Sequence, residues 1–148
     1  MKKIVKRLDV WKEEPLYWTH MSAIEKRVYA SSVPRSLIEL IKIRASQINK
    51  CVFCIDYHTN EALQLGESPR RIFVLSAWKE SPLFTEVEKS ALQLTEEITH
   101  ISVDGVADET YERIKTHFSA GEIADLIICI CHINFMNRIG ISTQTVAI

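Results

Sequence analysis

The sequence predicts an all-α protein, and three observations support this. Apolar residues recur every three to four positions through most of the chain, which is the spacing of one face of a helix. No segment alternates apolar and polar residues for long enough to indicate a strand. Helix-start and helix-stop residues also stand between the apolar segments. We therefore expect a single domain over residues 1–148, built from about six to eight helices with mostly short connections.

The first half of the chain contains a series of predicted helices, the first of which begins at residue 21. Residues 21–31 have the pattern of a short amphipathic helix, and Pro34 stands where the first turn of the next helix begins. The pair Asn49-Lys50 is a candidate break before a helix that starts near Cys51. Gly66 is well placed to end that helix because glycine readily adopts the left-handed conformation that closes many helices.

The second half of the chain contains two quartets with the spacing of a capping box. A helix is expected to start at Ser68-Pro69. The first capping box, Thr85-Glu86-Val87-Glu88, is expected to begin the helix after it. Ser119-Ala120-Gly121-Glu122 is expected to open the longest helix, roughly residues 122–138. That helix is apolar on most of its circumference, which predicts a place in the middle of the bundle or in a subunit interface.

Composition narrows the classes of function. The chain has 47% hydrophobic and 25% charged residues, as ordinary soluble globular proteins do. A formal net charge of −1 offers no basic surface for nucleic acid or for a membrane, so we expect neither as a partner. No apolar signal-peptide core follows the basic residues 1–7, and the longest apolar run, near residues 126–131, is short for a membrane span. We expect a cytoplasmic protein.

The four cysteines form two unlike pairs. In a cytoplasmic protein they do not suggest a structural disulfide framework. Cys129 and Cys131 lie in an apolar segment and are interpreted as small buried core residues. Cys51 and Cys54 lie among polar residues, and His58 follows them at a spacing that places all three within about 60° of one another on a helix.

This arrangement predicts a redox dithiol with its own acid/base group. A thiol reacts as the thiolate, and two features favour that form here. A chain break at Asn49-Lys50 would place Cys51 at a helix start, where free backbone N–H groups favour negative charge. His58 lies one turn beyond Cys54 and can take its proton, so we assign the nucleophilic role to Cys54. Cys51, nearer the helix end, is expected to resolve the oxidised sulfur and to be open to an external reductant.

Other interpretations of the cysteine pair stay open at this point. A thioredoxin-like site needs a strand before the motif, and none is predicted. Zinc is an alternative in which His117 or His132 would join Cys51, Cys54 and His58. An inert structural pair is another. His132 by itself is interpreted as a hydrogen-bonded core histidine on the apolar helix.

With Glu39, the pattern becomes Glu-x(11)-Cys-x-x-Cys-x-x-x-His over residues 39–58. This pattern resembles the core motif of the AhpD-like alkylhydroperoxidases in the carboxymuconolactone decarboxylase family, and the resemblance extends over about residues 15–140. It implies an AhpD-like helical bundle that forms oligomers, often trimers or hexamers. It also implies that Cys54 attacks the peroxide with Cys51 as its partner, and that Glu39 and His58 form the proton relay. From the residues alone, Glu39 would be a solvent-exposed helix glutamate.

The resemblance predicts a thiol-dependent peroxidase. Phe53 stands where better-known members carry a relay histidine, so the relay here must be shorter or use water. No nucleotide, flavin or haem motif is present, and we expect no cofactor and no metal. The reductant must then be an external thiol, by family likeness a lipoyl-bearing protein. The alternatives are a carboxymuconolactone decarboxylase-type lyase, against which the intact cysteine pair argues, and a non-enzymatic redox sensor or zinc-binding helical oligomer.

Overall fold

A computed structural model describes residues 5–146, and these residues contain helices and no strand. The fold class predicted from the sequence is therefore confirmed. Nine α-helices occur in this range, of which two are single turns of four residues, and a 3-10 helix follows the fifth. The elements are α1 (Val10–Glu13), α2 (Pro15–Tyr29), α3 (Arg35–Asn49), α4 (Val52–Gln64), α5 (Pro69–Val74), η1 (Leu75–Glu80), α6 (Glu86–Thr99), α7 (Ile101–Asp104), α8 (Asp108–Lys115) and α9 (Ala120–Ser142).

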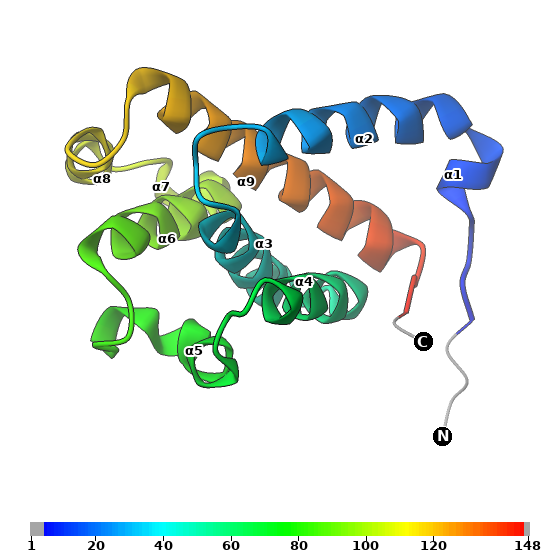
Figure 1. Ribbon diagram of the computed structural model, residues 1–148. Coiled ribbons are helices and arrows are strands. Elements are labelled where there is room, and N and C mark those ends of the chain that lie inside the picture. The colour runs from blue at the N-terminus through cyan, green and yellow to red at the C-terminus, as the bar shows by residue number, and fades with distance from the viewer. Residues whose placement is uncertain (1–4, 147–148) are drawn as a thin grey trace.

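Helix α3 is the centre of the bundle. It packs against α4, α6 and α9, and Figure 1 shows α2 and α9 together on one side of it and α4 and α5 on the other. Nine of its fifteen residues are buried, because three neighbouring helices cover more than one face of it. A helix buried on several sides can hold polar side chains away from water, and α3 carries Glu39 and Lys42 in this way.

Several local predictions are confirmed. Both capping boxes form, with the Thr85 and Ser119 hydroxyls accepting from the backbone N–H of Glu88 and Glu122. Gly66 follows the end of α4 with a φ of 88°, a left-handed conformation that glycine adopts without strain. The predicted helix at residues 21–31 is longer than expected, since α2 begins at Pro15, which occupies its first turn.

Helix α9 crosses the whole bundle and is longer than predicted at both ends. Among the described helices, it alone has the length and apolar composition needed to cross a membrane, and half of its most apolar stretch is buried in the bundle. Its two cysteines differ, because residues two apart face different sides of a helix. Cys129 is buried as predicted, whereas Cys131 is exposed, so the prediction for Cys131 was wrong.

A network of amide hydrogen bonds connects α9 to the end of α3. The Asn49 side chain donates to the Oδ1 atoms of Asn134 and Asn137, at 2.9 Å in both cases. Asn137 in turn donates to the Ser46 hydroxyl at 2.9 Å, and Asn134 donates to the Thr99 hydroxyl at 3.0 Å. These bonds satisfy polar groups that burial would otherwise penalise, and they hold α9 against the point where α3 ends.

Candidate active site

The candidate site begins at the break between α3 and α4. Lys50 adopts the left-handed conformation, with a φ of 61°. The Cys51 N–H donates to the Ser46 carbonyl and the Lys50 N–H to the Gln47 carbonyl, which is the Schellman pattern of helix termination. Cys51 then serves as the N-cap residue of α4. The predicted break at Asn49-Lys50 is confirmed, and it places the first cysteine at a helix start.

The two sulfurs of the motif form a disulfide and have different surroundings. Cys51 and Cys54 are bonded, with their Cα atoms 5.4 Å apart. Cys51 is only 1% exposed and packs against α9 at Gly140, where a methyl group would lie 3.1 Å from its sulfur. Cys54 borders the cavity described below, and Cys51 does not. The expectation that Cys51 is open to a reductant is therefore wrong for this disulfide form, because α9 covers that end of α4.

Glu39 and His58 lie together, as the family resemblance implied. The Glu39 side chain is completely buried, and its Oε2 atom is 2.8 Å from Nδ1 of His58. Its Oε1 atom accepts from the Arg35 guanidinium at 3.3 Å, and Arg35 also binds Glu61 at 3.1 Å. The interpretation of Glu39 as a solvent-exposed helix residue was wrong, because α4 covers the face of α3 on which it lies.

The environment of this pair sets its protonation. Burial acts to raise the pKa of Glu39, but the hydrogen bond and charge of His58, with the charge of Lys42, hold it below the ordinary value. Burial lowers the pKa of His58, although the hydrogen bond to Glu39 opposes this. An ionised carboxylate can only accept, so Nδ1 of a neutral His58 carries the hydrogen and Nε2 keeps its lone pair. His58 is thus arranged as a general base.

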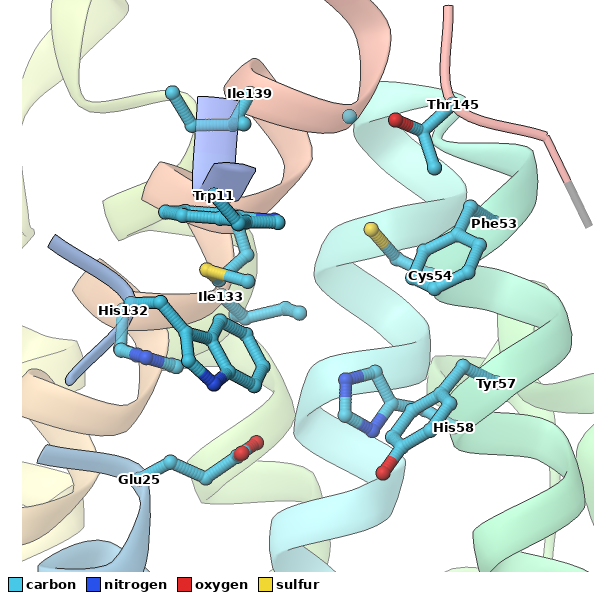
Figure 2. A pocket seen from close by; sticks show the side chains of 13 residues that line it. Trp11, Glu25, Phe53, Cys54, Tyr57, His58, His132, Ile133, Ile139 and Thr145 are labelled. Carbon is cyan, nitrogen blue, oxygen red and sulfur yellow. The ribbon is translucent and has the colours of Figure 1, made fainter. Parts of the chain in front are cut away.

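A cavity of about 450 Å³ lies beside Cys54 and His58. Its walls come from α1, α2, α4, α9 and the residues after α9, and Figure 2 shows their side chains around it. Most of the lining is apolar or aromatic, with a few polar groups, as in small-molecule sites. The lining residues are Trp11, Trp18, Glu25, Phe53, Cys54, Tyr57, His58, His132, Ile133, Met136, Ile139, Gly140 and Thr145.

Phe53 supplies part of the aromatic wall. Its ring stacks with that of Tyr57, with 6.2 Å between the ring centroids. The Tyr57 and His58 rings are perpendicular, with 5.1 Å between their centroids. An apolar ring thus occupies the position where a relay histidine was expected. Of the acid/base groups of the motif, His58 lines the cavity together with Cys54, and Glu39 is bonded to His58.

Sequence reasoning missed a buried polar network behind the cavity. Lys42 is 1% exposed, and its ammonium group lies 2.6 Å from Oε1 of Glu25 and 2.7 Å from the Tyr29 hydroxyl. A lysine among the apolar positions of α3 was the available signal, since a buried ammonium needs partners. His132 is buried and bonded to the Met21 carbonyl at 3.1 Å, as interpreted, but it also lines the cavity.

The zinc alternative finds no support within residues 5–146. No group of three or more histidine, cysteine or acidic side chains in this range is arranged to hold a metal ion. Cys51 and Cys54 are bonded to one another, and zinc requires them as separate thiolates. The arrangement is suited to thiol–disulfide chemistry, with a base beside the sulfur that faces the cavity.

A helical bundle that holds a Cys-x-x-Cys disulfide beside a buried Glu–His pair defines an AhpD-like protein. The family model described as the carboxymuconolactone decarboxylase family matches residues 14–97, which is more than half of the chain. The chain belongs to this family. A curated relative, the uncharacterized protein YdfG of Bacillus subtilis, is 45% identical over 122 residues, which cover 82% of this chain and 83% of the relative.

Solved structures agree on the fold. A protein of unknown function from Agrobacterium tumefaciens, provisionally assigned as the antioxidant defence protein AhpD, is 34% identical. The match has a TM-score of 0.93 and covers 97% of this chain and 99% of that one. The debrominase Bmp8, solved in complex with 2,3,4-tribromopyrrole, is 15% identical with a TM-score of 0.78, and the match covers 90% of this chain and 71% of that one. At this identity the debrominase indicates the fold alone.

Proposed function

We propose that this protein is a thiol-dependent peroxidase of the AhpD type, in which Cys51 and Cys54 are the redox pair. The observation that carries the proposal is the position of Cys54. It is the sulfur of the pair that borders the cavity, and it shares that border with a base, His58, whose other nitrogen is bonded to buried Glu39.

The chemistry starts from the reduced pair. Nε2 of His58 takes the proton of Cys54, and the thiolate attacks the terminal oxygen of a hydroperoxide. The O–O bond breaks, the alcohol leaves with the proton returned by His58, and Cys54 becomes a sulfenic acid. The Cys51 thiol then condenses with it, which releases water and forms the disulfide seen here. Glu39 stabilises the imidazolium while it exists.

Regeneration needs an external thiol, for which a lipoyl-bearing protein is the partner that the family likeness suggests. The disulfide must be attacked by a thiolate at one of its two sulfurs. Because Cys51 is buried under α9 and Cys54 borders the cavity, we place the attack at Cys54. The sequence had instead predicted that the external reductant would reach Cys51.

A peroxide assay tests the proposal. Hydroperoxide consumption is followed with an excess of a dithiol reductant for wild type, Cys54→Ser and Cys51→Ser. We expect Cys54→Ser to abolish turnover. Cys51→Ser should slow it strongly and form no intramolecular disulfide, because the Cys54 sulfenic acid can then be reduced only by direct attack of the external dithiol. Cys131→Ser is the matched control, since this exposed thiol lies outside the cavity lining, and it should retain wild-type activity. If both motif variants turn over like wild type, the peroxidase proposal fails.

Two alternatives predict different results in simple assays. A lyase of the carboxymuconolactone decarboxylase type would release carbon dioxide from the lactone in the Cys54→Ser variant as well as in wild type. A non-enzymatic redox sensor would also form the Cys51–Cys54 disulfide with peroxide, but it would not raise the rate of peroxide consumption above that of the dithiol reductant alone. The cavity beside Cys54 favours an enzyme, because a sensor needs no space for a small molecule.

Assembly and location are also proposals. We propose a homo-oligomer, a trimer or a hexamer, in the cytoplasm. Large apolar side chains on the surface support an assembly, among them Phe73 of α5, which is 80% exposed, and Ile128 of α9. Light scattering coupled to size-exclusion chromatography measures the oligomer number, and a monomeric mass at micromolar concentration would contradict the proposal.

A further inference from the structure

The cavity has a polar side that the peroxidase chemistry does not use. Glu25 of α2 and His132 of α9 line it across from Cys54, and Figure 2 shows both side chains on the wall opposite Cys54 and His58. Neither residue belongs to the motif at residues 39–58. A polar wall at this position faces whatever molecule reaches the disulfide, so its hydrogen-bonding character bears on which molecules fit.

His132 lines the cavity and has one ring nitrogen that can accept a hydrogen bond. Its Nε2 atom lies 3.1 Å from the Met21 carbonyl, and a carbonyl only accepts, so Nε2 carries the hydrogen. Burial lowers the pKa of His132, which keeps the ring neutral at neutral pH. Nδ1 of the neutral ring then has a free lone pair. Among residues 5–146, no side chain or backbone group donates to it.

Glu25 offers a second acceptor. Its Oε1 atom accepts from the Lys42 ammonium group at 2.6 Å, and its Oε2 atom remains for another donor. Lys42 lies behind the wall and does not line the cavity, and no described lining residue is a lysine or an arginine. Glu25 is therefore the only formally charged side chain among the described lining residues, and a carboxylate can only accept hydrogen bonds.

We propose that Glu25 and His132 form a recognition site for the tail of the reductant, and that the site selects a dithiol whose tail ends in a neutral hydrogen-bond donor. An amide N–H can bond to Nδ1 of His132 or to the Glu25 carboxylate. A carboxylate tail would face Glu25 with no lining cation to replace its lost hydration. The inference rests on the proposed function, in which a dithiol regenerates the pair.

The step that the site serves balances without another reactant. One thiolate of the reductant attacks Sγ of Cys54, the Cys54–Cys51 bond breaks, and Cys51 leaves as a thiolate. The second thiol of the reductant loses its proton and attacks the mixed disulfide, which frees Cys54 and closes the reductant into a cyclic disulfide. Two electrons and two protons pass to the cysteine pair. Binding of the tail at the opposite wall would hold the first thiol near Cys54.

Dihydrolipoamide and dihydrolipoate are the probes, because they carry the same dithiol and differ only in an amide or carboxylate at the tail. The rate of disulfide reduction is measured by rapid acid quench and mass spectrometry, with no peroxide present. We expect dihydrolipoamide to react at least about tenfold faster than dihydrolipoate, a ratio within the usual strength of a hydrogen bond to a charged group. Equal rates in wild type would overturn the inference.

Two variants assign the preference to residues. Glu25→Gln removes the charge and keeps an oxygen for Lys42, and it should raise the dihydrolipoate rate and bring the ratio near one. His132→Phe should slow dihydrolipoamide more than dihydrolipoate. Glu112→Gln is the control for charge removal, since Glu112 is an exposed residue of α8 that does not line the cavity. A ratio unchanged in both cavity variants would overturn the assignment.

The outcomes separate this inference from the proposed function. If the preference for the amide is absent while peroxide is still consumed, the inference fails and the peroxidase proposal stands. If the preference is present while no peroxide is consumed, the recognition site stands and the peroxidase proposal fails. Thermal melts of each variant show whether a slow rate reflects lost folding, and the wild-type rate ratio needs no variant.

Discussion

The contact between α9 and the disulfide at Gly140 allows a sharp test of the oxidised site. In Gly140→Ala, the new methyl carbon would lie 3.1 Å from Sγ of Cys51 and 3.9 Å from Sγ of Cys54. The shorter distance requires the Cys51 sulfur to move by a few tenths of an ångström. In the disulfide this sulfur is held on both sides, by its own backbone and by Cys54. In the reduced protein it is free to rotate to another staggered position.

The two redox states should therefore respond differently to Gly140→Ala. Replacing a helix-interior glycine by alanine stabilises both states by about 1 kcal/mol. Overpacking costs about 1–3 kcal/mol, and we expect it mainly in the oxidised state. The oxidised protein should then be between unchanged and about 2 kcal/mol less stable to unfolding. The difference between the states corresponds to a reduction potential about 20–60 mV less negative, since 30 mV is about 1.4 kcal/mol for two electrons.

The measurement is a redox titration in dithiothreitol buffers, with the oxidised fraction read by thiol alkylation and mass spectrometry. Gly121→Ala is the matched control, because it is the same change in the same helix with no atom within 4 Å of the new methyl group. The reasoning is refuted if the potentials of Gly140→Ala and Gly121→Ala agree within about 10 mV. Such a result would mean that α9 moves away from the disulfide at no cost.

Three further predictions concern the buried charges. Glu39→Gln leaves His58 without its ionised partner and should lower kcat/KM for peroxide by about 100-fold or more. A loss below about threefold in the peroxide assay would contradict the role of Glu39 in the relay. Lys42→Met leaves the Glu25 carboxylate unpaired, so urea titration should show a free energy of unfolding reduced by about 3 kcal/mol. A reduction under about 1 kcal/mol would contradict the importance of the Lys42–Glu25 ion pair for stability. Burial lowers the pKa of both His58 and His132, so below about pH 6.5 the unfolded chain binds protons that the folded chain does not. The stability that the two neutral histidines contribute is therefore fully present above about pH 6.5 and is lost as the pH falls below it. A melting temperature that rises from pH 7 to pH 5 would contradict this.

Local sequence signals predicted the helices and their ends. The capping boxes at Thr85 and Ser119, the left-handed end at Gly66 and the break at Asn49-Lys50 all formed as expected. Each of these depends on hydrogen bonds or backbone conformations within about one helical turn, so neighbouring residues are enough to specify it. The spacing of Cys51, Cys54 and His58 is local in the same sense, and it identified the redox motif.

The position of Glu39 shows where local reasoning stopped. Twelve residues before Cys51, on a different helix, it had no local sign of burial, and only the resemblance to a family connected it with the thiols. Its contact with His58 exists because α3 and α4 pack against one another on either side of the break at Lys50. Lys42, in the next turn of α3, was missed for the same reason.

The sequence by itself determined that the chain is helical, where the chain breaks before the motif, and which thiols and imidazole share one face of a helix. Tertiary structure alone decided that Cys54 faces a cavity while α9 covers Cys51, and that Glu25 and His132 stand on the opposite wall. The physical reason is the distance along the sequence between the residues that interact. Helix formation depends on contacts between residues a few positions apart, whereas the exposure of a side chain depends on which distant helix packs over it.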